Sequence, residues 1–421
     1  MAFRLSIAIT ALAACHSNPA ANGDGSIDSV GSDLAGGSDV LPDAGAVALP
    51  QLQFCQVTNT VNLNAAYTTQ VVGDAVAYSC ATPCSDWTTC TFGLSSAAGP
   101  TMSARGDQMQ ALAFVVDGMG GHIVFTPDGT DVVLTHVGDG GTSVFNPFDL
   151  QIQMLSDLKT VSLGWEKGTP NILAGGGWFT RKDATPTSTR GQAARPAAVI
   201  QWVKDNFAQG QKLGTVGSSM GTAATFGAHV WYGLDSIIDY QMLIGGPGFW
   251  DVNAGCGRVH TSEGHCDEDA SACTGNANSS YGNDDPFCGT STTNNCRVPT
   301  VMAPTAAGSA YNSVINYVAM TTACVNMAND SRDSSLDDSS LAMTVSDWNF
   351  RGRIDFVTNE GGTQPPNADQ GMGEGHMMAI YTQIQSAKSW NDNQGYHHGD
   401  SWDIDPTLMK AGAQLVVDGM K

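Results

Sequence analysis

Short apolar segments alternate with longer amphipathic segments from about residue 110 to the end of the chain. Apolar runs rich in Val, Ile, Leu and Phe and bounded by turn residues predict strands. Strands are expected at 111–116, 122–126, 131–136, 160–165, 236–246 and 353–360, with a further short one just before residue 219. Apolar positions at helical spacing predict helices at 147–158, 190–207, 374–388 and 406–420. Because strands and helices alternate, the sequence predicts a mostly parallel, doubly wound sheet.

Three stretches depart from this alternation. Residues 16–50 are mostly Gly, Ala, Asp, Ser and Pro, which predicts a disordered linker because such a segment cannot bury much apolar surface. Residues 51–109 carry four cysteines and alternating Thr and Val, and predict a small β appendage. Residues from about 250 to 345 carry six cysteines among many polar residues. We interpret that stretch as a disulfide-rich lid inserted into the main domain, 110–421.

The N-terminus has the pattern of an export signal. Arg4 precedes the apolar run 5–12, which is too short to span a bilayer. The run ends in Leu-Ala-Ala-Cys15, which resembles a bacterial lipobox, and residues 1–15 are therefore expected to be a lipoprotein signal peptide. A plain signal peptide is the alternative. The sequence thus predicts an exported protein that is anchored to a membrane through lipid on Cys15, or is secreted.

The number of cysteines also fits an exported protein. Of the 11 cysteines, removal of Cys15 to lipidation leaves an even number, in one group near the N-terminus and one between residues 256 and 324. Disulfides within each group are expected in an oxidising compartment, but the spacing does not define the connectivity.

The charge excludes one class of partner. A formal net charge of −22 argues against nucleic acid, because nucleic-acid binders present a basic face. We expect a monomer that meets the membrane only through its lipid, and the motifs below imply neither a metal nor an organic cofactor.

One motif suggests chemistry. Gly217-Ser218-Ser219-Met220-Gly221 is a Gly-x-Ser-x-Gly sequence that follows an apolar run and precedes a helical run of small residues. A serine on such a strand-turn-helix is a nucleophile elbow, and its flanking glycines let strand and helix pass closely. The alternative is a glycine-rich turn with an idle serine, because 49 glycines make a chance match common.

A nucleophilic serine also needs two donors for the oxyanion. The N–H of Met220, the residue after the serine, is one candidate. Gly138, in the glycine loop that follows the strand 131–136, is the second.

The general base is expected just before the last helix, where His397 and His398 are adjacent. We favour His398 because a following glycine suits a catalytic histidine on a turn. His397 remains the alternative, and His376 is a rival that lies before the helix predicted at 374–388.

The orienting acid is expected after the strand 353–360. Glu360 at the strand end and Asp369 further on are the candidates. Asp355 lies inside the strand and is expected to point elsewhere.

Several segments resemble a group of secreted, esterase-like bacterial α/β-hydrolases. The likeness covers roughly residues 110–420, and the segments that carry it are 195–203, 217–221, 232–239 and 245–248. It implies an α/β-hydrolase fold and a Ser-His-acid triad. The sequence departs from that group at 359–363, Asn-Glu-Gly-Gly-Thr, where an aspartate usually lies, so the resemblance does not identify the acid.

The leading hypothesis is therefore an exported serine hydrolase that cleaves a small or polymeric carboxylic ester. A peptidase or amidase with the same triad is one alternative, because fold and triad do not fix the scissile bond. An inactive surface binding module is another. Trp165, Trp178 and Trp250 follow strands or glycine loops and either line a substrate pocket or belong to the core.

Overall fold

The computed structural model describes most of the predicted sheet and its helices. The described residues are 48–57, 61–62, 80, 82–96, 99–100, 102–136, 147–166, 178, 189–218, 220–244, 350–358, 381, 384, 386–392 and 406–421. They belong to one compact unit of the chain, Val47–Lys421.

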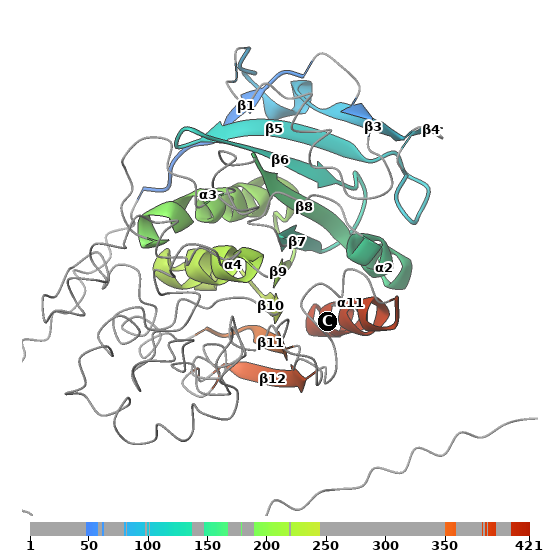
Figure 1. Cartoon of the computed structure of the whole chain (residues 1–421), viewed down its shortest axis with the longest axis vertical. Helices are drawn as coiled ribbons and strands as arrows, with labels where there is room; N and C mark the ends of the chain where they lie inside the picture. The colour runs from blue at the N-terminus through green and yellow to red at the C-terminus, as the bar shows by residue number, and fades with distance from the viewer. Residues whose placement is uncertain are drawn as a thin grey trace, which may run out of the picture. The chain divides into compact units, whose positions relative to one another are not determined.

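A twisted sheet forms the centre of this unit (Figure 1). Its core strands are β5 (Gln110–Val116), β6 (Met119–Phe125), β7 (Val132–His136), β8 (Lys159–Trp165), β9 (Leu213–Ser218), β10 (Tyr240–Ile244), β11 (Arg353–Thr358) and β12 (Ala387–Asp392). Across the sheet the order is β5-β6-β8-β7-β9-β10-β11-β12. β6 is antiparallel to both neighbours, whereas all the other adjacent pairs from β8 to β12 are parallel. This is the α/β-hydrolase fold, as the sequence predicts, whereas the lid predicted at about 250–345 lies outside the described residues.

Helices cover both faces of the sheet (Figure 1). α3 (Thr189–Phe207) and α4 (Met220–Trp231) pack on one face, where they share a large apolar core with Leu134, Leu163 and Leu243. α2 (Pro147–Leu155) and α11 (Pro406–Gly419) lie on the other face. Because residues alternate between faces along a strand, each core strand contributes to both layers.

The N-terminal cysteine-bearing segment extends the sheet beyond β5. β1 (Gln53–Cys55) and β3 (Phe92–Ser96) both pair antiparallel with β5, while β2 (Val61–Asn62) and β4 (Gly99–Pro100) pair with β3. Disulfides join Cys55 to Cys80 and Cys84 to Cys90. The expectation of bridges within the N-terminal group is thus confirmed for these four cysteines.

Aromatic side chains attach this extension to α3. Trp87 contacts Trp202 edge-on, with ring centroids 5.4 Å apart, and its indole N–H donates to Asn206 Oδ1 at 3.0 Å. Phe54 lies 4.9 Å from the same Trp202 ring. The appendage is therefore held by a hydrophobic contact as well as by strand pairing.

The prediction of a helix at 374–388 is wrong in its last residues, because Ala387 and Lys388 begin β12. The sequence reading also missed this strand, since only Trp390 is a large apolar residue within it. Tertiary contacts stabilise it instead. Trp390 stacks on Phe356 of β11 with centroids 5.9 Å apart, and Asn391 Nδ2 donates to the Phe356 carbonyl at 3.2 Å.

Two other predicted elements are shorter in the structure. The strand predicted at 236–246 starts only at Tyr240, in β10 (Tyr240–Ile244), because a 3-10 turn, Leu234–Ser236, precedes it, and residues 245–246 lie outside the described residues. The helix predicted at 147–158 ends at Leu155, where the Ser156 hydroxyl donates to the Ile152 carbonyl at 2.7 Å and caps the last turn.

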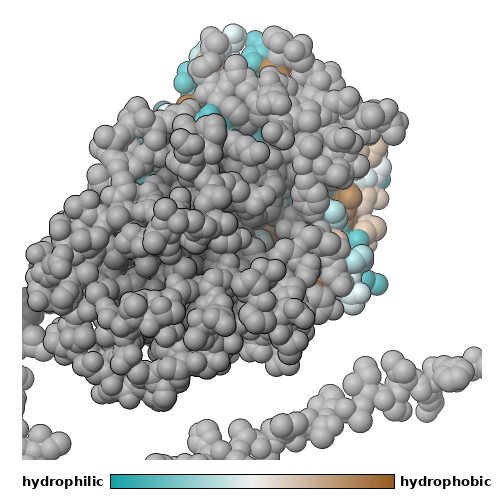
Figure 2. All heavy atoms as spheres, in the orientation of Figure 1, coloured by the Kyte–Doolittle hydropathy of each residue, from teal (hydrophilic) through white to brown (hydrophobic). Residues whose placement is uncertain are grey.

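Within the described ranges, no helix combines the length and apolar character needed to cross a membrane. The large hydrophobic side chains described as exposed are Met102 and Met154. On the visible part of the described surface, brown and tan residues are interspersed with teal ones (Figure 2).

Candidate active site

The chain turns from strand to helix across Ser219. β9 ends at Ser218 and α4 begins at Met220, so the strand-turn-helix context that the motif predicts is confirmed. β9 is the fifth of the core strands in chain order and lies between β7 and β10. Ser219 itself lies outside the described residues, and its role as a nucleophile stays a prediction.

Both glycines of the motif are required by close backbone approach. A Cβ on Gly217 would overlap the Thr225 hydroxyl and the backbone of Gly221. A Cβ on Gly221 would overlap the carbonyl oxygen of His136 and lie 2.6 Å from its Nδ1. The first turn of α4 therefore rests directly on the ends of β9 and β7, as expected for an elbow.

Gly221→Ala should destabilise the fold by about 3 kcal/mol, because the added methyl group meets rigid backbone rather than a movable side chain. Gly210→Ala is the matched control. Gly210 has φ +69° and open space around it, so alanine there meets only backbone strain, which costs about 1 kcal/mol. Denaturant unfolding of both variants measures the difference. Equal losses would show that α4 can move away from β7 without cost.

The two predicted oxyanion donors follow neighbouring strands. Met220 is the first residue of α4, and first-turn N–H groups of a helix have no intrahelical acceptor. Gly138 comes two positions after His136, the last residue of β7, and lies outside the described residues. Because His136 pairs with Gly217, the segments bearing the two donors leave the sheet side by side.

His136 itself is a feature that the sequence reading missed. Its side chain is fully buried, and Trp165 Nε1 donates to its Nε2 at 2.8 Å. Burial lowers the pKa of His136 from 6.5 to about 3, and a contact with its own backbone acts weakly in the opposite direction. The sequence did carry a signal for His136, because it is a polar residue at the end of an apolar strand, directly before a glycine loop.

A second buried polar group anchors the start of α2. Asp149, fully buried, accepts from the Thr135 hydroxyl and the Ser162 hydroxyl, each at 2.8 Å. These hydroxyls come from β7 and β8, on the face opposite to His136. Buried hydrogen bonds therefore join the start of α2 to β7 and β8.

The predicted acid and base follow the later strands along the chain. Glu360 lies two positions after the end of β11, and Asp369 lies further on. His397 and His398 fall between β12 and α11. β9, β11 and β12 run parallel, so the segments that follow them start from the same edge of the sheet. All four side chains, and His376, lie outside the described residues.

Asp355 has a structural role, as its place inside β11 predicts. Its carboxylate is fully buried and accepts from Tyr240 Oη at 3.0 Å, Arg353 Nε at 2.8 Å and Ser389 Oγ at 2.7 Å. Burial, aided by the Asp355 carboxylate, raises the pKa of Tyr240 well above 10. The cluster joins β10, β11 and β12, and it leaves Glu360 and Asp369 as the candidate acids.

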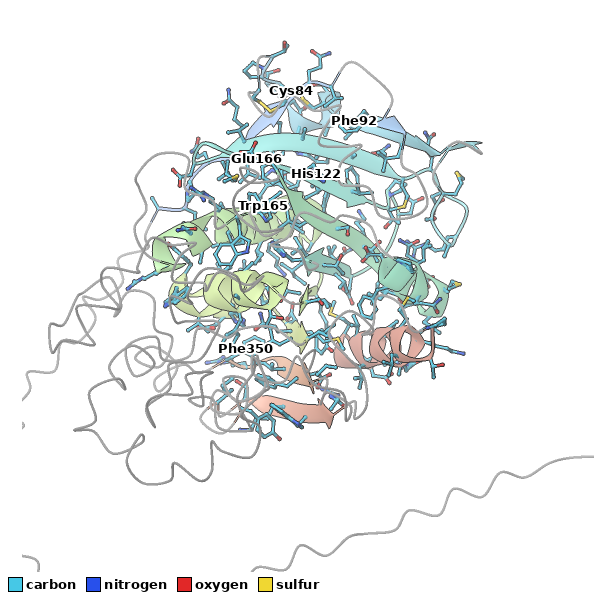
Figure 3. The ribbon with its side chains drawn as sticks, viewed as in Figure 1. Cys84, Phe92, His122, Trp165, Glu166 and Phe350 are labelled. Carbon is cyan, nitrogen blue, oxygen red and sulfur yellow. A yellow bond between two sulfur atoms is a disulfide. The ribbon has the colours of Figure 1, made fainter. Side chains whose placement is uncertain are left out.

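Trp165 and Trp178 belong to the core. Both are almost completely buried, and Trp165 contacts Phe114 edge-on at 5.6 Å on the face covered by α3 and α4 (Figure 3). The Trp178 carbonyl accepts from Arg195 Nη1 of α3 at 2.7 Å, and Arg195 also pairs with Asp117 at 3.3 Å. Core packing thus explains both side chains, whereas Trp250 lies outside the described residues.

Within the described part of the chain, no cluster of three or more His, Cys, Asp or Glu side chains is arranged to hold a metal ion. The expectation that the protein uses neither a metal nor an organic cofactor stays a prediction.

No protein-family model matches the sequence, and neither does any curated protein. The fold is similar to that of acetyl xylan esterase 1 from Thermoanaerobacterium sp. JW/SL YS485, at 13% identity and TM-score 0.41 over 74% of this chain and 82% of the other. It is also similar to Est1E from Butyrivibrio proteoclasticus, at 11% identity and TM-score 0.40 over 74% and 98% of the two chains. Such distant likenesses do not extend to the site or the substrate.

Proposed function

We propose that this protein is an exported serine hydrolase that cleaves a carboxylic ester through Ser219. The observation that supports it is the turn at Ser219, between β9 and α4, with Gly217 and Gly221 pressed against neighbouring backbone. A serine in that position is presented at the carboxyl edge of a parallel sheet, where α/β proteins bind their ligands. A glycine-rich turn without a catalytic role would not require close contacts with neighbouring backbone at both Gly217 and Gly221.

In the proposed reaction, Ser219 Oγ attacks the ester carbonyl while His398 accepts its proton. The N–H groups of Met220 and Gly138 donate to the oxyanion that forms. His398 then gives the proton to the departing alkoxide, and the acyl-enzyme is hydrolysed by water in a second, equivalent cycle. Glu360 holds the imidazole in the required orientation. His397 and Asp369 are the alternative base and acid.

The same proposal places the protein outside the cytoplasm, anchored by lipid on Cys15. Two disulfides among the described cysteines are consistent with an oxidising compartment. The ester bond is the proposed target in preference to an amide because the elbow resembles that of esterase-like enzymes.

The full chain treated with a fluorophosphonate probe tests this proposal. An activated serine forms a Ser Oγ–P bond and releases fluoride, and peptide mapping should find the adduct on Ser219. His398→Ala should stop the labelling, whereas His397→Ala should leave it nearly unchanged. Absence of an adduct on the folded protein would contradict the proposal. Parallel assays with aryl esters and aryl amides then separate an esterase from an amidase.

A further inference from the structure

His136 lies where both oxyanion donors of the proposed site originate. It ends β7, so the backbone that leads to Gly138 begins at its carbonyl group. Its carbonyl oxygen and its ring also form the surface beneath Gly221, the residue that follows Met220. A shift of His136 would therefore move both donors at once.

Trp165 fixes the ring of His136 in one chemical form. An indole N–H can only donate, so the Nε2 that accepts from it at 2.8 Å must carry a lone pair and no proton. The low pKa of His136, about 3, keeps the ring neutral at ordinary pH. The single ring proton is therefore on Nδ1, which faces Gly221.

A neutral ring suits this location. Nδ1 is fully buried beside the first turn of α4, and among the described residues only the backbone of His136 itself offers it a polar contact. An imidazolium there would be repelled by the positive end of the α4 dipole. It would also be destabilised because burial removes its hydration shell. The hydrogen bond from Trp165 is thus the contact with another described residue that holds the orientation of the ring.

We propose that His136 is a positioning residue for the oxyanion hole, and that its ring, held by Trp165, sets the separation between the end of β7 and the first turn of α4. The proposal rests on the function proposed above. Oxyanion donors act mainly in the transition state, so a small change in their separation should lower kcat and leave KM nearly unchanged. Loss of one such donor costs about 10²–10³ in kcat, and its displacement should cost less.

Trp165→Phe removes the indole N–H and keeps an aromatic ring, and Phe114→Leu is its matched control. Phe114 packs against Trp165 but makes no bond to His136, so its replacement weakens the same core without releasing the imidazole. We expect Trp165→Phe to lower kcat and the rate of Ser219 phosphonylation about tenfold, with KM changed less than twofold. Phe114→Leu should lower stability and leave both rates within about twofold.

Substitution of His136 provides a rescue test. His136→Gln keeps an acceptor for the Trp165 N–H, whereas His136→Leu keeps bulk without any acceptor. The glutamine variant should retain most of kcat, and the leucine variant should lose at least about tenfold per folded molecule. NMR of the protein labelled with ¹⁵N-histidine should show His136 as the Nδ1–H form in the wild type and as a mixture of forms in Trp165→Phe.

The outcomes separate this proposal from the one on which it rests. If wild-type Ser219 is not phosphonylated, the hydrolase proposal fails, and the positioning role fails with it. If Ser219 reacts and Trp165→Phe keeps its kcat, only the positioning role is overturned. An Nε2–H form of His136 in the wild type would overturn it as well.

Discussion

Ser219→Ala is expected to reduce ester hydrolysis by roughly 10⁴-fold or more while the protein stays folded. The reason is that the covalent route disappears completely when Oγ is absent, and only binding and the oxyanion donors remain. Steady-state assays on the same esters, at equal concentrations of folded protein, measure the effect. The unfolding free energy should change by less than about 0.5 kcal/mol, because a nucleophile that meets a substrate must be accessible and its hydroxyl then adds little to stability.

Ser218→Ala is the matched control, because it makes the same chemical change one position earlier. Ser218 is the last residue of β9 and is buried, with 7% of the residue exposed. Its replacement should alter kcat by less than about threefold, since no step of the proposed reaction uses this hydroxyl. If both variants keep the wild-type activity, another residue must be the nucleophile. If only Ser218→Ala loses activity, Ser218 is the nucleophile.

Mild acid is expected to destabilise the fold strongly through two buried histidines. His122 and His136 are both fully buried, and burial lowers the pKa of each from 6.5 to about 3. In the unfolded chain each histidine takes up a proton near pH 6.5. Their contribution to stability is therefore complete above pH 6.5 and is lost as the pH falls toward 3.

The loss should approach 1.4 kcal/mol per pH unit for each histidine, or about 5 kcal/mol for both between about pH 7.5 and pH 4.5. That is comparable with the whole stability of many proteins. Denaturant unfolding at several pH values measures the slope. The slope gives the number of protons taken up on unfolding. His122→Gln and His136→Gln should each lower that number by about one, and the double variant by about two. A slope unchanged in the double variant would show that carboxylates cause the acid lability.

The early strands and the two helices beside the elbow follow directly from the sequence. Their apolar residues have one dominant environment, a sheet buried on both faces, so local pattern and tertiary structure agree. The apolar run at 131–136 predicts β7 to within one residue, and the helix predicted at 190–207 corresponds to α3. The Gly-x-Ser-x-Gly motif likewise predicted the strand-to-helix turn, because an apolar run precedes it and a helical run of small residues follows it.

The sequence did not predict the contacts between polar residues on different strands. β12 has little apolar periodicity, and it is a strand because β11 supplies backbone partners and Phe356 supplies a ring for Trp390. The sequence predicts only that Asp355 points away from the site, whereas its partners Tyr240 and Ser389, far from it along the chain, are defined by the tertiary structure.

By itself, the sequence determined the order of the strands and helices up to β11, the glycines around Ser219 and the grouping of the N-terminal cysteines, but not their pairing. Those features depend on residues that are near one another along the chain or on their apolar character. Only the tertiary structure decided that Trp165 and His136, 29 positions apart, share a hydrogen bond beneath the elbow. A hydrogen bond between distant residues depends on which strands become neighbours, and β7 pairs with β8 only after the chain has crossed over through α2.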